Sequence, residues 1–186
     1  MEFPLSVNAI QELKAMGFKI NWMLLKIGYE GDEFLPQFLS MDSVYQYAKE
    51  QLIEGIDSNE ELVVRLIIDV EDESGDDYNF LRALERLIAT ECANQSVQKR
   101  KWRAYLVKRE LSTIPDDYLN GLLALTSLWI SLGLPDDCPH IIQGRNNLYT
   151  PRKYYTQKVF DVLLEKNKQW LKDEIEYIKS LESTPP

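Results

Sequence analysis

Cysteine and histidine are scarce in this sequence. The chain contains two cysteines, Cys92 and Cys138, and one histidine, His140. Two cysteines outside any Cys-x-x-Cys pattern exclude a disulfide scaffold and the usual paired zinc ligands. Free thiols are typical of a reducing compartment. Because there is a single histidine, a Ser-His-Asp or Cys-His catalytic system would have to use His140.

Targeting and phosphate-binding motifs are also missing. The first residues, MEFPLSVNAI, lack the basic and apolar regions of a signal peptide. No Gly-x-Gly-x-x-Gly or Gly-x-x-x-x-Gly-Lys-Ser/Thr pattern occurs. The most apolar stretch, 115–135, contains Asp116, Asp117 and Asn120, whereas a membrane span needs about 20 predominantly apolar residues. We therefore expect a cytoplasmic protein without a membrane segment, a cofactor or a metal site.

The apolar stretch predicts the central helix of the fold, over residues 116–132. Its apolar residues are spread round the whole circumference of a helix, and such a helix must be covered on all sides. Pro115 and Asp116 are typical of a helix start, and Gly133 and Pro135 of a helix end. We therefore expect this helix to be buried.

Amphipathic patterns predict helices on both sides of it, with Asn21, Asp42 and Ser58 as N-caps and Gly55 as a stop. No stretch shows the alternation and hairpin turns of a sheet. The predicted fold class is all-α: a single-domain irregular bundle of about seven to eight helices around the central helix, with a long C-terminal helix. The domain should span 1–182 and leave 183–186 as a disordered tail. The expected helices cover residues 7–16, 18–28, 43–54, 59–70, 78–92, 96–111, 116–132 and 156–181. Gly28 and Gly31 are expected to bracket a turn. The apolar stripe of the helix over 78–92 is expected to consist of Tyr78, Leu81, Leu84, Leu87, Ile88 and Cys92.

The formal net charge of −9 is unevenly distributed. Residues 1–95 carry 7 Lys and Arg against 19 Asp and Glu, a net −12, and residues 96–186 carry 14 against 11, a net +3. Phosphate neutralisation dominates nucleic-acid affinity, so this acidity argues against a DNA- or RNA-binding protein. It is compatible with a basic protein partner.

The densest charge lies between Asp69 and Asp77, where six carboxylates surround Gly75. A calcium-binding EF-hand loop with Gly75 at its sixth position would need acids where the chain has Val70 and Leu81. The favoured interpretation is a solvated loop between helices, and the alternative is a surface for a basic partner. The candidate partner-binding residues of this run are Glu71, Asp72, Glu73, Asp76 and Asp77.

A basic run between residues 99 and 109, with Trp102 and Tyr105 interleaved, has a superficial likeness to a nucleic-acid patch. Lys99, Lys101 and Arg103 fall on the outer half of one predicted helix, opposite the aromatic residues. We favour a solvated face that complements the acidic run within the fold.

The least regular segment, 134–155, is predicted to be a loop, and long loops in compact domains are often functional. Asp136, Cys138 and His140 would form a metal or nucleophile site only if three alternate side chains converged there. Two prolines make that convergence awkward, and zinc ligands usually come from separated pairs. An ordinary loop histidine is therefore favoured.

Arginine and tyrosine gather at the end of this segment, at Arg145, Tyr149, Arg152, Tyr154 and Tyr155. These residue types are common at binding hot spots. They also anchor loops on helical cores, which is the favoured interpretation. If the segment binds a partner, we expect Arg145 and Tyr149 to contact it.

Three aromatic stretches stand out once the helices are placed. They are Asn21-Trp22 through Gly28-Tyr29, Lys101-Trp102 with Tyr105-Leu106, and Leu128-Trp129-Ile130 running into Gly133-Leu134-Pro135. In this order and spacing the chain resembles a bacterial family of small acidic helical proteins, of the type that serves as immunity partners of polymorphic secreted toxins. The resemblance implies a cytoplasmic protein that neutralises a toxin domain by tight one-to-one binding.

The predicted function is a non-enzymatic protein-binding module, most concretely an immunity protein that neutralises a cognate bacterial toxin domain directly. If that toxin is a basic nuclease, the acidic N-terminal half would steer it. One alternative is a helical adaptor or regulatory protein with another partner. The other is an enzyme with an unrecognised site of carboxylates or His140.

Overall fold

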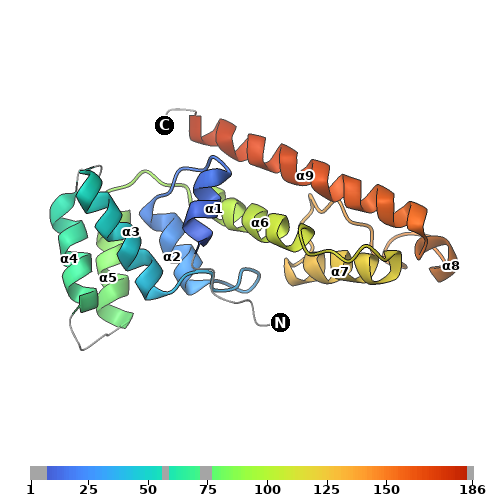
Figure 1. The fold of residues 1–186 in the computed structure, drawn as a ribbon, viewed down its shortest axis with the longest axis horizontal. Helices are drawn as coiled ribbons and strands as arrows, with labels where there is room; N and C mark the ends of the chain where they lie inside the picture. The colour runs from blue at the N-terminus through green and yellow to red at the C-terminus, as the bar shows by residue number, and fades with distance from the viewer. Residues whose placement is uncertain (1–7, 56–58, 72–76, 184–186) are drawn as a thin grey trace. The chain divides into compact units, whose positions relative to one another are not determined.

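The computed structural model describes residues 8–55, 59–71 and 77–183, without the side chains of residues 69–71. Every regular element in these ranges is a helix, so the predicted all-α class and the long C-terminal helix are confirmed. The described helices, nine in these ranges, are α1 (Ala9–Ala15), α2 (Trp22–Glu30), α3 (Met41–Glu54), α4 (Glu60–Glu71), α5 (Asp77–Ile88), α6 (Gln95–Leu111), α7 (Tyr118–Ser131), α8 (Pro151–Tyr154) and α9 (Gln157–Ser183) (Figure 1).

The contacts within the chain divide it into two compact units. Unit 1 extends to Trp102, and unit 2 covers Arg103–Ser183, so the boundary falls within α6. In unit 1, α4 packs against α3 and α5, and α2 packs against α3 and α5. In unit 2, α7 packs along α9. One domain over 1–182 with a tail at 183–186 stays a prediction, and 184–186 lie outside the described residues.

The core of unit 1 is built around Trp102, whose side chain is fully buried. Its ring stacks on Phe38 with 4.6 Å between ring centroids, and its indole N–H donates to the Leu24 carbonyl at 2.7 Å. Gly28 lies against the same ring, because a Cβ at this position would come within 2.3 Å of Trp102 Cζ2. Gly28 therefore belongs inside α2, where only a hydrogen atom fits, and does not bracket a turn.

Local capping explains where α3 begins and ends. Gly55 ends it with φ of 62°, as predicted from the freedom of glycine in the left-handed region. The predicted cap at Asp42 is wrong, because Ser40 Oγ accepts from the Ser43 N–H at 3.2 Å and starts the helix earlier. Asp42 lies in the first turn, where its charge favours the positive end of the helix dipole. Ser58 lies outside the described residues.

The predicted burial of the central helix on all sides is wrong. In unit 2, α7 buries one face, which includes Leu122, Leu125 and Trp129, against the core. Its opposite face exposes apolar side chains, among them Leu123 at 45% and Ile130 at 54%. The reason is that α9 packs along one side of α7. A stretch that is apolar all round its circumference therefore folds as a half-buried helix.

Candidate partner-binding surface

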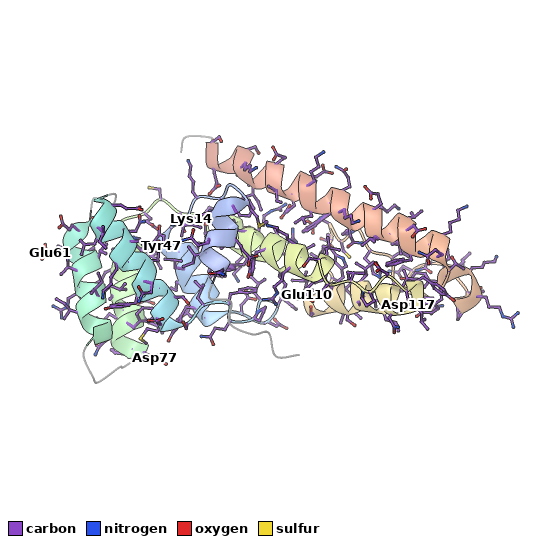
Figure 2. The ribbon with its side chains drawn as sticks, viewed as in Figure 1. Lys14, Tyr47, Glu61, Asp77, Glu110 and Asp117 are labelled. Carbon is purple, nitrogen blue, oxygen red and sulfur yellow. The ribbon has the colours of Figure 1, made fainter. Side chains whose placement is uncertain are left out.

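Asp77 is the first residue of α5, and its side chain is exposed (Figure 2). Its Oδ1 accepts a hydrogen bond from the Tyr29 hydroxyl on α2 at 2.7 Å. Partial burial of Tyr29, this hydrogen bond and the charge of Asp77 together raise the pKa of Tyr29 to about 12. The phenol therefore keeps its proton at neutral pH and goes on donating, and Asp77 presents a negative charge held in position.

Two exposed apolar side chains lie at the same end of the α4–α5 pair. Tyr78 follows Asp77 and is 66% exposed, and Ile68, one turn before the end of α4, is 55% exposed. The two helices pack against each other, α4 ends at residue 71, and α5 begins at residue 77. Ile68, Asp77 and Tyr78 are called the α4–α5 tip below. An aromatic side chain, a branched side chain and a carboxylate at one end of a helix pair are groups that a protein partner can bury and pair.

The rest of the predicted acidic surface is only partly described. Asp72, Glu73 and Asp76 lie outside the described residues, and Glu71 ends α4 with its side chain outside the description. Of the acidic candidates, Asp77 is the one whose side chain is placed.

The predicted place of Tyr78 in the apolar stripe of α5 is wrong, because this tyrosine is 66% exposed. The buried stripe consists of Phe80, Ala83, Leu84 and Leu87. The spacing of Phe80, Leu84 and Leu87 at i, i+4 and i+7 is the sequence pattern from which the buried face of α5 could have been predicted correctly. Tyr78 lies off that stripe and faces solvent.

Arg145 and Tyr149 belong to a loop of unit 2 that is tied to itself by side chains. Asn147 Nδ2 donates to the Ile142 carbonyl at 2.6 Å, and its Oδ1 accepts from the Tyr149 N–H at 3.2 Å. Gln143 Nε2 donates to the Tyr149 carbonyl at 2.9 Å. Arg145 and Tyr149 are both exposed on this hydrogen-bonded loop. The structure brings Arg145 and Tyr149 into one loop of unit 2, and Asp77 belongs to unit 1.

The Tyr149 side chain is anchored on one edge. Its ring packs at 72° to the ring of Tyr154, with 5.9 Å between the centroids, and Tyr154 is buried. Tyr149 keeps 39% of its surface exposed. One tyrosine therefore both holds the loop on unit 2 and offers a face to solvent.

His140 is buried in unit 2, and its surroundings are hydroxyls. Its Nε2 lies 2.9 Å from Thr126 Oγ1 and 3.3 Å from the Tyr154 hydroxyl. Those hydroxyls donate to the carbonyls of Leu122 and Ile141, so their oxygens are left to accept from the ring. This places the histidine proton on Nε2 and leaves Nδ1 buried without a hydrogen-bond partner in the described chain. Burial lowers the pKa of His140 to about 4, so the ring is neutral at pH 7.

The neighbours of His140 along the chain do not assemble a reactive site. Cys138 Sγ donates to the His140 carbonyl at 3.7 Å, and burial raises the pKa of its thiol, so it is a poor nucleophile. The Asp137 carboxylate binds Arg103 at 2.7 Å instead of turning towards the ring. In the part of the chain that the structure describes, no three His, Cys, Asp or Glu side chains come together in a way that would hold a metal ion.

The basic run of α6 pairs within the fold. Lys99 binds Asp32 at 2.7 Å, and Arg103 binds both Asp137 and the buried Glu174, the latter at 3.0 Å. The predicted solvated position of Lys101 is wrong, because this side chain is fully buried. Its ammonium donates to the Lys19 carbonyl and to Gln98 Oε1, both at 2.7 Å. Helical periodicity alone would place Lys101 on the surface. The fold instead supplies two hydrogen-bond acceptors for its ammonium group, so the charged side chain is buried.

The chain matches a family model over residues 10–175, which is most of its length. The family is described as "Uncharacterized protein conserved in bacteria (DUF2247)". The chain belongs to this family. No curated protein and no solved structure matches it. Within the described ranges of this DUF2247 chain, no helix combines the length and apolar character needed to cross a membrane. The match supports the predicted resemblance as far as a conserved bacterial family.

Proposed function

We propose that this protein is a non-enzymatic binding protein that neutralises a bacterial toxin domain in the cytoplasm, using the α4–α5 tip. The observation that carries the proposal is that the exposed Tyr78 and Ile68 lie at the same end of the α4–α5 pair as the positioned carboxylate of Asp77. Buried tyrosines dominate many protein interfaces, and single carboxylates at their edge set the approach of a charged partner.

The charge of the chain favours a basic partner for this surface. Residues 1–102 carry 10 Lys and Arg against 19 Asp and Glu, a net −9, whereas residues 103–186 carry 11 of each. The negative field of the chain therefore originates in unit 1, which contains the tip. A basic toxin domain would approach such a surface faster than a neutral one, and the rate would fall as salt screens the charge.

The surroundings of His140 favour binding over catalysis. A general base must reach its substrate, and the Nδ1 lone pair of this buried ring reaches none of the described polar groups. The nearby thiol has a raised pKa, and the nearby Asp137 is engaged by Arg103. These contacts support an ordinary structural role for the histidine.

The first experiment is affinity capture of the tagged protein from its host, with mass spectrometry of what remains bound at moderate salt. We expect one stoichiometric partner with a large N-terminal secretion region and a variable C-terminal domain, whose toxicity this protein abolishes. Recovery of a partner without toxic activity would replace the proposal with an adaptor role. A reproducible enzymatic activity that His140→Phe abolishes without unfolding the chain would replace it with an enzyme.

The second experiment tests the tip itself with the captured domain. Tyr78→Ala should weaken binding about tenfold or more, because a buried tyrosine contact is lost. Asp77→Asn keeps an acceptor for Tyr29 but removes the charge, so it should slow association several-fold and flatten its salt dependence. Tyr118→Ala, which removes an exposed tyrosine of α7, is the matched control and should leave binding unchanged. Equal losses at Tyr78 and Tyr118 would exclude the tip as the contact.

A further inference from the structure

Unit 2 contains an apolar hollow between α9 and the loop that precedes α8. Its volume is about 170 Å³. Hydrogen bonds from Asn147 to the Ile142 carbonyl and from Gln143 to the Tyr149 carbonyl tie the loop side together. Six apolar or aromatic side chains line it: Ile141, Tyr149, Tyr154, Val159, Val162 and Leu163.

The size and lining of the hollow suit one aromatic ring. An apolar cavity of about 150 Å³ accommodates a benzene molecule, whereas drug-sized ligands occupy about 300 Å³ or more. Tyr149 and Tyr154 already pack edge to face across one wall, at 72°. A further ring placed beside them can adopt the offset or edge-to-face geometry that aromatic groups prefer.

Two lysines complete the lining and give it a positive charge. Lys158 and Lys166 are both exposed and stand one turn before and one turn after Val162 on the same face of α9. At 1.5 Å of rise per residue, their Cα atoms are about 12 Å apart along the helix. Neither makes an ion pair in the described part of the chain, whereas nearby acids such as Asp161 accept from neighbouring amides. Among the described residues, no acidic side chain lines the hollow.

We propose that this hollow binds a small aromatic carboxylate, with its ring against Tyr149 and Tyr154 and its carboxylate between Lys158 and Lys166. The apolar lining supplies affinity for the ring, and the two ammonium groups select an anion over a neutral or cationic analogue. The site belongs to unit 2 and does not rest on toxin binding by the α4–α5 tip.

Titration calorimetry of the full chain with phenylpropionate and with its neutral amide tests the proposal. We expect saturable binding in the millimolar range or tighter, with the carboxylate bound about fivefold more tightly than the amide. Lys158→Ala combined with Lys166→Ala should bring the two compounds to equal affinity while the ring still binds. Val162→Trp should fill the hollow and abolish binding of both compounds, and thermal unfolding confirms that each variant is folded.

The matched control combines Lys168→Ala with Lys172→Ala, two exposed lysines of α9 outside the hollow. It should keep the preference for the carboxylate. The proposal is overturned if phenylpropionate does not bind saturably, if the amide binds equally well, or if the control loses the preference. Binding of an acidic, phenylalanine-containing peptide without binding of phenylpropionate would also overturn it, because the hollow would then be part of a protein interface.

Discussion

Trp102 in unit 1 and Trp129 in unit 2 are both fully buried, so each indole N–H needs an acceptor inside the protein. Trp102 donates to the backbone carbonyl of Leu24, which any residue at position 24 would supply. Trp129 donates to the side-chain oxygen of the buried Asn167 at 2.5 Å. The buried indole of unit 1 therefore depends on the position of a backbone carbonyl, whereas the buried indole of unit 2 depends on the identity of the side chain at position 167.

The two units share one packing feature, a glycine packed against an aromatic ring. Gly28 packs against the Trp102 ring in unit 1, and Gly121 packs against the Phe160 ring in unit 2, where a Cβ would come within 2.4 Å of Phe160 Cε2. Each glycine lies inside a helix, where alanine would ordinarily be favoured. Both units therefore use a glycine to make room for an aromatic ring. They differ in whether the backbone or a side chain accepts from the buried indole N–H.

The largest test of this comparison concerns His140, a second polar side chain on which unit 2 depends. Its pKa is about 4 in the folded chain against an ordinary 6.5, so the unfolded chain takes up a proton first as the pH falls. The stabilisation is complete above pH 6.5 and decreases as the pH approaches 4, by about 3 kcal/mol in total. Urea unfolding of the wild type and of His140→Gln at pH 7 and pH 4 measures it. We expect the wild type to lose about 3 kcal/mol more than the variant over this range, and equal losses would show that the ring is not desolvated.

A smaller effect should follow when the acceptor of Trp129 is removed. Asn167→Leu keeps a similar volume but leaves the buried indole N–H without a partner, which should cost about 2 kcal/mol of unfolding free energy. In a Trp129→Phe background the same substitution should cost less, because no N–H remains to be satisfied. Urea unfolding of the four proteins gives the coupling between the two residues. An equal cost in both backgrounds would mean that unit 2 does not depend on this pair.

The smallest effects should come from the two glycines. Overpacking against a buried ring costs about 1–3 kcal/mol, and alanine returns about 1 kcal/mol of helix propensity. Gly28→Ala and Gly121→Ala should therefore each destabilise the chain by about 1 kcal/mol. Combining Gly28→Ala with Trp102→Leu should relieve the clash with the ring. Combining Gly121→Ala with Phe160→Leu should relieve it only in part, because the added Cβ also comes within 2.8 Å of the Pro115 carbonyl oxygen. Thermal unfolding checks this, and stabilisation by either single alanine would show that the ring can move aside.

The fold was predictable where short-range chemistry decides it. Asn21 caps α2 by accepting from the Leu24 N–H at 2.8 Å, and Gly55 ends α3, both as expected. Capping and the 3.6-residue repeat involve groups within about four positions of each other, which the sequence displays directly. The all-α class follows from these local signals.

The candidate site was predictable only in part. The exposure of Asp77 followed from its place in a charged run, but its hydrogen bond to Tyr29 joins residues 48 positions apart. Tyr78 was assigned to the core because hydrophobicity alone does not distinguish a buried stripe from a residue beside it. The apolar hollow was missed because it needs α9 and a distant part of the loop together, although Tyr149 had been singled out.

The sequence by itself determined the all-α class, the cap at Asn21, the stop at Gly55 and the acidity that originates in residues 1–102. Only the tertiary structure decided which polar groups become buried. Lys101 is the clearest case: its position on α6 predicts a solvated charge, and the Lys19 carbonyl, 82 positions away, helps to bury it. Burial depends on what packs against a helix face, and that is set by contacts between segments that no local pattern encodes.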